Sequence, residues 1–346
     1  MDDPRVPDEL FLDYDLPQEL IAQTPIEPRD ASQLLVLDRA SGSITDRRFS
    51  DLPELLDSGD LLVVNNSKVI PARIAARRKS GGSVELLLLE RRAGTCWEAL
   101  ARPLSRLRPG EMLDVVADDG SATDHRVRFA GRKGSLAIID LLDERVVDQH
   151  GSMPLPPYIH KRLEDGERYQ TVYSEEPGSA AAPTAGLHFT PRLLEHCRGQ
   201  GIECAELTLH VGVDTFRSLD QDDPADHRMH SEWFSIPEHT WQAIMRARDE
   251  GRRVVSVGTT VTRVLETVAD PDWSDGTLTG RTSKFIRPPY EFRVAGAQIT
   301  NFHLPRTTLL LMIGAFAGSG LLREAYEHAV RRRYRFYSFG DAMLIV

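Results

Sequence analysis

Four histidines in unusual sequence contexts are the residues of this chain best suited to proton transfer. His188 lies in PTAGLHFT, His210 in LTLHVGVDTFR, His230 in MHSEW and His303 in ITNFHLP. Imidazole titrates near neutrality and can accept or donate a proton at physiological pH. Each could equally be a core histidine held by a backbone carbonyl. We expect His188, His210 and His303 to be the catalytic residues.

The stretch PTAGLHFT precedes a helix start, because Thr190 is a good N-cap and Pro191 suits the first turn. The residues before His188 are small. We expect Thr184 and Gly186 to let a ligand approach closely while His188 is presented for proton transfer.

A metal site is the alternative use of the histidines. His227, His230 and Glu232 are close in sequence, and His210 lies four residues before Asp214. No H-E-x-x-H or comparable ligand spacing is present. We expect no metal, and a metal-dependent hydrolase stays open as an alternative function.

The string RVVSVGTT predicts a strand that leads into a helix at Gly258, Thr259 and Thr260. Free N–H groups and two hydroxyls at a helix N-terminus suit a carboxylate or a phosphate. A capped helix with no ligand is the alternative. Neither a P-loop nor a complete dinucleotide fingerprint is present.

The composition is that of a globular, nonmembrane protein of about two domains. The chain has 346 residues, 41% hydrophobic and 27% charged, with a net charge of −10. Its three cysteines show no C-x-x-C spacing, which fits a reducing cytoplasm. The N-terminus does not read as a signal peptide, and the apolar run from Thr308 to Gly318 is too short to span a bilayer and predicts a buried helix.

Positive charge is concentrated in two places. The stretch from Arg73 to Arg108 contains nine Lys or Arg and three acids, which gives it a local charge of +6. RRRYRFYSFGD, which starts at Arg331, interleaves arginines with aromatic rings. Guanidinium groups bind phosphates and aromatic faces stack on unpaired bases, so these clusters favour RNA as a partner. An ordinary solvated surface is the alternative.

The order of the patterns predicts the fold. Short strand-like runs broken by turn signals occupy residues 73–152 and indicate a small antiparallel β-barrel domain. Strands alternate with helices after MPLPPYI. We therefore expect an α/β catalytic domain made of residues 1–72 and 153–346, interrupted by the β-barrel.

Taken together, the strings resemble the S-adenosylmethionine:tRNA ribosyltransferase-isomerase family, which acts in queuosine biosynthesis. The resemblance runs nearly from end to end through DYDLPQELIAQTPIEPRDAS, GDLLVVNNSKVIPARI, MPLPPYI, ERYQTVYSEEPGSAAAPTAGLHFT, LTLHVGVDTFR, MHSEW, VGTT, ITNFHLP and YSFGDAML. Their number and order make it specific.

The resemblance implies a cytoplasmic, metal-free transferase, taken to be a monomer, with S-adenosylmethionine as co-substrate. The ribosyl part moves to 7-aminomethyl-7-deazaguanine at the wobble position of tRNA with a GUN anticodon, and adenine and methionine are released as epoxyqueuosine forms. Transfer to a different acceptor is an alternative. The expected substrate-binding residues are Asn65, Asn66, Lys68, Arg73, Thr184, Gly186, Arg217, Glu232, Gly258, Thr259, Thr260, Asn301 and Asp341.

Three positions depart from the pattern usual in that family. Gln33 stands where arginine is common, Pro289 where glycine is common and Gly296 where aspartate is common. The loss of one arginine and one carboxylate is expected to bear on contacts with the acceptor.

Overall fold

The computed structural model describes residues 13–117, 119–161, 163, 165–212, 229, 231–270 and 278–346. The chain forms two compact units. One contains residues 1–67, 157–175 and 183–346, and the other contains residues 68–156 and 176–182. Each is described by itself.

The second unit is a closed antiparallel β-barrel, as the turn-rich pattern predicted. Its strands follow the order β5, β6, β7, β10, β9, β8, and pairing of β5 with β8 closes the ring. The barrel strands are β5 (Arg73–Arg78), β6 (Ser83–Ala93), β7 (Cys96–Arg102), β8 (Glu111–Val116), β9 (Ala122–Lys133) and β10 (Leu136–Asp140). Inward residues such as Ile74, Leu86 and Phe129 alternate with outward polar ones, which is the period-2 pattern of a half-buried strand.

Four shorter elements accompany the barrel. Helix α2 (Arg145–His150) precedes β11 (Gly151–Ser152), which pairs with β5. A separate two-stranded sheet joins β4 (Ser67–Val69) to β12 (Glu176–Ser179).

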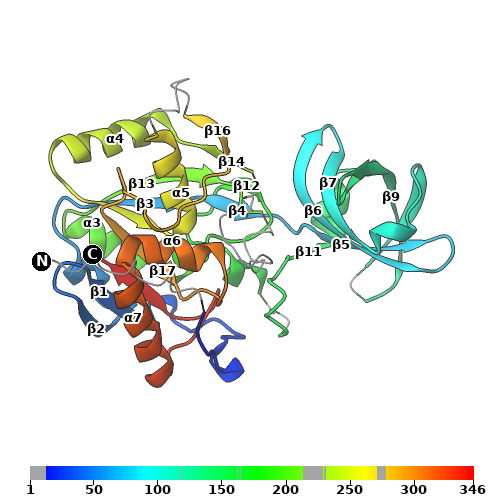
Figure 1. Cartoon of the computed structure of the whole chain (residues 1–346). Helices are drawn as coiled ribbons and strands as arrows, with labels where there is room; N and C mark the ends of the chain where they lie inside the picture. Colours follow the sequence, from blue (N-terminus) through cyan, green and yellow to red (C-terminus); the bar gives the residue numbers. More distant parts are fainter. Residues whose placement is uncertain are drawn as a thin grey trace, which may run out of the picture. The chain divides into compact units, whose positions relative to one another are not determined.

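The first unit is built on a mixed sheet in the order β16, β14, β13, β3, β15, β17, β18, β1, β2 (Figure 1). The strands are β1 (Gln33–Asp38), β2 (Ser43–Arg48), β3 (Leu61–Asn65), β13 (Glu203–Leu209), β14 (Glu232–Ser235), β15 (Val254–Val257), β16 (Thr279–Thr282), β17 (Ala297–Asn301) and β18 (Ala342–Ile345). The α/β fold with an inserted barrel is thus confirmed.

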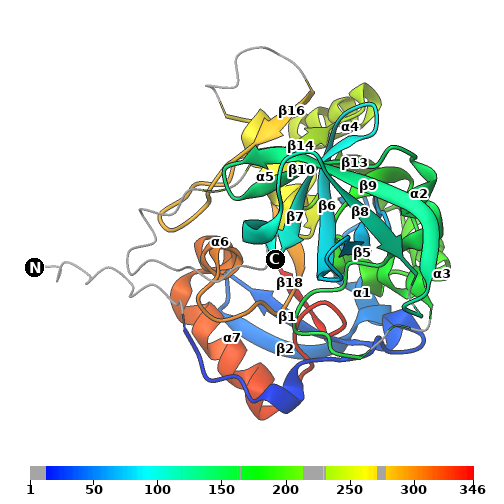
Figure 2. The same cartoon turned by 90° about the vertical axis from the view of Figure 1, so that its right-hand side faces the viewer.

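Helices cover both faces of this sheet. They are α1 (Leu52–Leu55), α3 (Pro191–Gly199), α4 (Glu238–Asp249), α5 (Thr259–Val268), α6 (Thr308–Ala317) and α7 (Ser319–Arg331). Residues of α1 and α3 pack on one face with Leu34, and residues of α6 and α7 pack on the other with Leu35. Figure 2 shows α6 and α7 beside β1 and β2. Burial on both faces explains why strands such as β3 and β15 are apolar without alternation.

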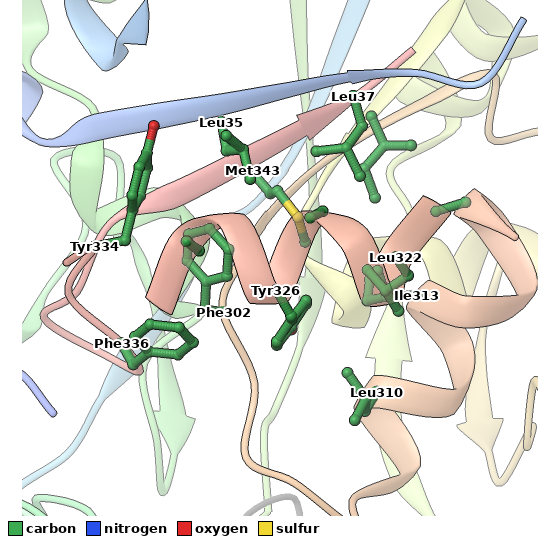
Figure 3. Packing of buried hydrophobic residues seen from close by; sticks show 14 of the residues in the cluster. Leu35, Leu37, Phe302, Leu310, Ile313, Leu322, Tyr326, Tyr334, Phe336 and Met343 are labelled. Carbon is green, nitrogen blue, oxygen red and sulfur yellow. The ribbon is translucent and has the colours of Figure 1, made fainter. Parts of the chain in front are cut away.

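The core under α6 and α7 mixes aromatic and aliphatic side chains (Figure 3). It confirms that the apolar run at Thr308 forms a buried helix. Within the described residues no single helix is long and apolar enough to cross a bilayer, and α6 and α7, which bend by 114°, pass that test only as a pair. The labelled members of this core are Leu35, Leu37, Phe302, Leu310, Ile313, Leu322, Tyr326, Tyr334, Phe336 and Met343.

Candidate active site

Strand direction gathers most of the expected site residues at one edge of the mixed sheet. Strands β13, β3, β15 and β17 are parallel neighbours, so their carboxyl ends meet at the same edge. This edge holds Asn65, His210, Gly258 and Asn301. The carboxyl ends of parallel strands are where open α/β sheets bind ligands. We therefore place the candidate site here.

His188 lies at this edge in a buried hydrogen-bonded chain. It ends the 3₁₀ helix η6 (Thr184–His188) and its ring stacks on Phe49 with the centroids 4.9 Å apart. Its Nδ1 is 2.8 Å from the Ser32 hydroxyl, and its Nε2 is 3.2 Å from the amide nitrogen of Asn301. Only 4% of His188 is exposed. The ring is therefore held at both nitrogens.

The backbone carbonyl of Tyr337 determines the tautomer of His188. This carbonyl accepts a hydrogen bond of 3.0 Å from the amide nitrogen of Asn301, which fixes the orientation of that amide. The same NH₂ group then donates to Nε2 of His188, so Nε2 must be unprotonated. The proton of the neutral ring lies on Nδ1 and is donated to Ser32.

Burial and nearby cations keep the His188 ring neutral. Burial, with smaller contributions from the charges of Arg335 and Arg29, lowers the pKa of His188 to about 3. Burial also lowers the pKa of His303 to about 3. Both rings are neutral at physiological pH, and as free bases both are weaker than the value near 7 that suits a general base.

We expect the protein to lose stability as the pH falls below about 6.5. A histidine whose pKa is about 3 when folded and about 6.5 when unfolded takes up its proton first in the unfolded chain. For His188 the loss at about pH 5 is about 2 kcal/mol. Denaturant unfolding at about pH 7.5 and pH 5 checks this, and His188→Gln should show the smaller difference. An equal difference in both proteins would contradict it.

The start of α5 presents a hydroxyl that the described chain leaves without a partner. Gly258 has a φ of 93°, which favours glycine, and its N–H donates to the carbonyl of Ile299. Thr259 and Thr260 follow, each 7% exposed. The buried Oγ1 of Thr260 has no hydrogen-bond partner in the described part of the chain. The Thr260 hydroxyl is thus a candidate group for binding a ligand.

The start of β14 holds a buried ion pair beside His210. Glu232, 3% exposed, pairs with Arg263 of α5, 2% exposed, and accepts a hydrogen bond of 2.9 Å from the N–H of Gly212. The ring of His210 stacks on Trp233 with the centroids 5.0 Å apart. The charge of Glu232 is therefore already balanced by a guanidinium of this chain.

His303 follows β17 and is less constrained than His188. Its Nε2 is 3.4 Å from the Thr300 hydroxyl, and its buried Nδ1 has no hydrogen-bond partner among the described residues. Its backbone is fixed by Tyr326, whose hydroxyl accepts from the His303 N–H. The ring nitrogens of His303 are thus less fully engaged than those of His188.

Asn65 and Asn66 join strand ends to each other. The amide oxygen of Asn65 accepts from the N–H groups of Ser67 and Leu209, and its amide nitrogen donates to the carbonyl of Leu209. The amide oxygen of Asn66 accepts from the Thr208 hydroxyl at 2.7 Å. Asn65 therefore holds β3 against the end of β13.

Asp341 precedes β18 and lies at the same edge, because β18 is antiparallel to β17. It is 1% exposed and accepts hydrogen bonds from the backbone N–H groups of Gln33 and Arg335. Its Oδ2 is also 3.3 Å from the side-chain amide of Gln33. Burial raises the pKa of Asp341. Because Gln33 stands where arginine is common in the family, this chain lacks a possible cation beside the Asp341 carboxyl.

The other two departures lie elsewhere. Gly296 precedes β17 and bonds to Val254 at the start of β15, which is the opposite edge of the sheet. Pro289 is exposed in the segment before β17. Neither position belongs to the residues gathered around His188.

The remaining expected site residues lie in other segments. Lys68 and Arg73 belong to the barrel unit, where Arg73 pairs with Glu85 at 2.9 Å. Arg217 lies outside the described residues, as do Asp214, His227 and His230. Thr184 begins η6 and is half-buried.

The structure gives Gly186 a different role from the expected one. A Cβ at this position would lie 2.1 Å from the hydroxyl of Tyr173 and 2.8 Å from a methyl of Thr171. The glycine is therefore required by packing within the chain. The expectation that it lets a ligand approach closely stays a prediction.

Many cations of the two basic clusters are neutralised within the chain. In the barrel Arg73, Arg78, Arg91 and Arg92 pair with carboxylates, whereas Arg77, Lys79, Arg102, Arg106 and Arg108 make no ion pair with the described residues. In the second cluster Tyr334 and Phe336 are fully buried. Their expected stacking on unpaired bases is therefore wrong, because their rings pack against Phe302.

No group of three or more metal-ligating side chains is found among the described residues. Sequence reasoning also missed several members of the site: Arg29, Ser32, Phe49, Arg263 and Tyr337. Arg29 and Ser32 lie in the PRDAS part of a string used for the resemblance, which was the available signal. The other three are brought in by packing or by a backbone carbonyl, which residue type does not reveal.

Known proteins are similar to this chain over nearly its whole length. Residues 10–345 match the model of a family described as queuosine biosynthesis protein. A protein of Symbiobacterium thermophilum named S-adenosylmethionine:tRNA ribosyltransferase-isomerase is 50% identical over 342 residues, which cover 96% of this chain and 98% of the relative. One of the same name from Dehalococcoides mccartyi is 46% identical over 337 residues, with the same two coverages.

A solved structure is also similar to this chain. The crystal structure of S-adenosylmethionine tRNA ribosyltransferase from Thermotoga maritima matches with a TM-score of 0.56 and 39% identity. The match covers 97% of this chain and 99% of that one.

Proposed function

The chain belongs to the family of queuosine biosynthesis proteins, and we propose that it acts as an S-adenosylmethionine:tRNA ribosyltransferase-isomerase. It is an enzyme that uses S-adenosylmethionine and tRNA as substrates. It transfers and isomerises the ribosyl moiety onto 7-aminomethyl-7-deazaguanine at the wobble position, giving epoxyqueuosine and releasing adenine and methionine.

One observation supports this function more than any other. Neutral His188, the Thr260 hydroxyl and the amide of Asn301 come from three different segments and lie at the carboxyl edge of one parallel set of strands. This edge offers polar groups of the kinds that the reaction requires, in the place where such sheets bind ligands. The unit that contains the mixed sheet is the catalytic domain.

The sulfonium of S-adenosylmethionine acidifies the hydrogens of the adjacent 5′ carbon, so a positioned base can remove one and begin the rearrangement. The acceptor amine must be neutral to attack. His188, His210 and His303 are the candidates for these proton transfers. Thr260 and Thr259 hold the carboxylate of the methionine part at the start of α5. Asp341 is a carboxyl at this edge that could face the cation.

The direct test of the function is adenine release. The purified protein is incubated with S-adenosylmethionine and tRNA that contains the precursor base, and free adenine is measured against tRNA with unmodified guanine. Release that needs both substrates is the expected result. Release without precursor tRNA, or after addition of a metal alone, would instead favour a hydrolase.

We expect Thr260→Val to weaken binding of S-adenosylmethionine roughly ten-fold. The change keeps the shape of the side chain and removes one hydroxyl, and a hydrogen bond to a charged group contributes about 1.5–3 kcal/mol. Stability should be unchanged or slightly higher, because a buried hydroxyl without a partner is removed. Calorimetry with S-adenosylmethionine and a thermal melt measure both. Unchanged affinity would exclude Thr260 from the site.

We expect Arg77→Glu with Lys79→Glu to weaken tRNA binding and to make its salt dependence shallower. Neither cation has an ion pair in the described chain, and each lost phosphate contact changes the salt slope by about 0.9 units or less. Arg78 is left unchanged because it pairs with Glu111 at 2.6 Å. Affinity is measured at several salt concentrations.

The control for this pair is Arg91→Glu, whose cation is already paired with Glu144. It should change tRNA affinity less. Equal affinity of all three proteins at low salt would mean that this face of the barrel is ordinary solvated surface.

Finer properties follow from the same proposal. The acceptor tRNA has a GUN anticodon, and the protein works in the cytoplasm as a monomer without a metal or a membrane. Gln33 beside Asp341 is the one observation that favours a related acceptor instead.

A further inference from the structure

A second polar feature, a hollow beside His188, has no role in the function described so far. It opens between the segment before η2 (Arg29–Ala31), the helix η5 (Gly166–Tyr169) and the turn before β18. Its lining residues are Pro25, Ile26, Arg29, Arg168, Leu187, His188, Ser338, Phe339 and Gly340. Two of these are arginines, and both belong to the unit of the mixed sheet.

Arg29 has no carboxylate partner in the described part of the chain. Its Nη1 donates to the carbonyl of Gln170 at 2.6 Å and its Nη2 to the carbonyl of Glu167 at 2.9 Å. These two bonds fix the guanidinium and leave other N–H groups of its five available. The positive charge of Arg29 is therefore positioned but not balanced by an ion pair.

Arg168 adds a second positive charge at the same hollow. Its Nη2 donates to the carbonyl of Ile26 at 2.8 Å and pairs with Glu27 at 2.9 Å. The Glu27 side chain is 75% exposed, so solvent screens this pair strongly. The hollow thus has two fixed guanidinium groups, and the carboxylates of Glu27, Asp165 and Glu167 are the counter-charges near them.

The two guanidinium groups are close enough to repel each other. Burial, and next the charge of Arg168, lower the pKa of Arg29. Like charges at close range cost free energy that a bound anion would offset. A planar guanidinium matches the oxygen spacing of a phosphate or a carboxylate.

We propose that this hollow is an oxyanion subsite, in which Arg29 and Arg168 bind a backbone phosphate of the tRNA or, in place of Thr259 and Thr260, the carboxylate of S-adenosylmethionine. The inference rests on the proposed function, which supplies both ligands. The subsite places its oxyanion next to His188, because His188 lines the same hollow. Arg29 and Arg168 are binding residues and take no part in proton transfer.

The test compares Arg29→Gln and Arg168→Gln with a matched control. Arg192→Gln removes the same charge from an exposed position on α3 that makes no ion pair with the described residues. Dissociation constants for S-adenosylmethionine and for tRNA that contains the precursor base are measured separately, each at several salt concentrations. Arg29→Gln and Arg168→Gln are each expected to weaken the binding of the same one of the two ligands about ten-fold or more. Arg192→Gln is expected to leave the binding of both ligands unchanged.

The two ligands give different signatures. A phosphate in the hollow predicts weaker tRNA binding with a salt slope shallower by about 0.7–0.9 units and normal affinity for S-adenosylmethionine. A methionine carboxylate in the hollow predicts weaker binding of S-adenosylmethionine and normal affinity for tRNA. The proposal is overturned if both variants bind both ligands as tightly as Arg192→Gln does.

Loss of folding is separated from loss of the subsite. Arg29→Gln removes two bonds to carbonyls of η5, so a thermal melt accompanies every measurement. If that variant does not fold, Arg168→Gln decides the question, because the carboxylate that pairs with Arg168 is 75% exposed and the pair adds little to stability. A wild-type protein that binds neither ligand would contradict the proposed function itself. Unchanged binding in the variants would contradict only the subsite.

Discussion

Replacing His188 by alanine is expected to lower turnover by about 10²- to 10⁴-fold, while most of the affinity for S-adenosylmethionine is kept. The ring is neutral and lies between Ser32 and Asn301 at the carboxyl edge of the sheet. Removing it takes away a proton-transfer candidate and also releases the Asn301 amide. Single-turnover adenine release and calorimetry measure the two quantities.

His196→Ala is the matched control for this variant. His196 is exposed on α3 and its side chain makes no hydrogen bond or ion pair with the described residues, so turnover should be unchanged. Near-normal turnover in His188→Ala would remove His188 from the mechanism. His303, whose Nδ1 has no partner among the described residues, would then be tested next, followed by His210.

The pH profile distinguishes two roles for His188. If His188 only positions its neighbours as the Nδ1–H tautomer, the rate should not depend on its titration, and His188→Gln should recover part of the activity. Asn301→Asp would then place a carboxylate beside Nε2 and favour the protonated ring, which nitrogen NMR of labelled histidine detects. If His188 is the base, glutamine should recover nothing.

The fold could be predicted from the sequence because its patterns are local. Alternation and turn signals marked β6 and β7, and the alternation of strands with helices after MPLPPYI marked β13, α4, β15 and α5. Thr190 does accept from the N–H of Leu193 as an N-cap, as its type suggested. Such signals depend on neighbours in the chain, which the sequence shows directly.

The site could be predicted only as far as strand ends reveal it. Gly258 was expected because it follows an apolar strand, and Asn301 because it lies in a string that carries the resemblance; parallel pairing of β15 with β17 brings both to one edge. Tyr334 was misread, and the packing requirement at Gly186 was missed, because the contacts that explain them come from other segments, Asp46 in the first case and Tyr173 in the second. The sequence shows that a residue is a glycine or a tyrosine, but not which residues it contacts in the folded chain.

Glu232 shows the same difficulty for charge. Glu232 was expected to be a substrate-binding residue, and a carboxylate can attract a cationic co-substrate. In the structure both Glu232 and Arg263 are almost fully buried and pair with each other. A carboxylate that is already paired has less to offer a sulfonium than one without a guanidinium partner. Its main contribution should therefore be to stability, by joining the start of β14 to α5.

Replacing Glu232 by alanine is accordingly expected to lower the free energy of unfolding by about 3–5 kcal/mol, because the guanidinium of Arg263 stays buried without its counter-charge. Glu250→Ala is the control: Glu250 pairs with Arg252 at 2.6 Å but is 52% exposed, so its loss should cost about 0–1 kcal/mol. Glu232→Met combined with Arg263→Met should recover most of the loss, since no charge is then left unpaired. Denaturant unfolding of the four proteins measures these values. Weaker binding of S-adenosylmethionine in Glu232→Ala, with stability unchanged, would instead make Glu232 a ligand of the co-substrate.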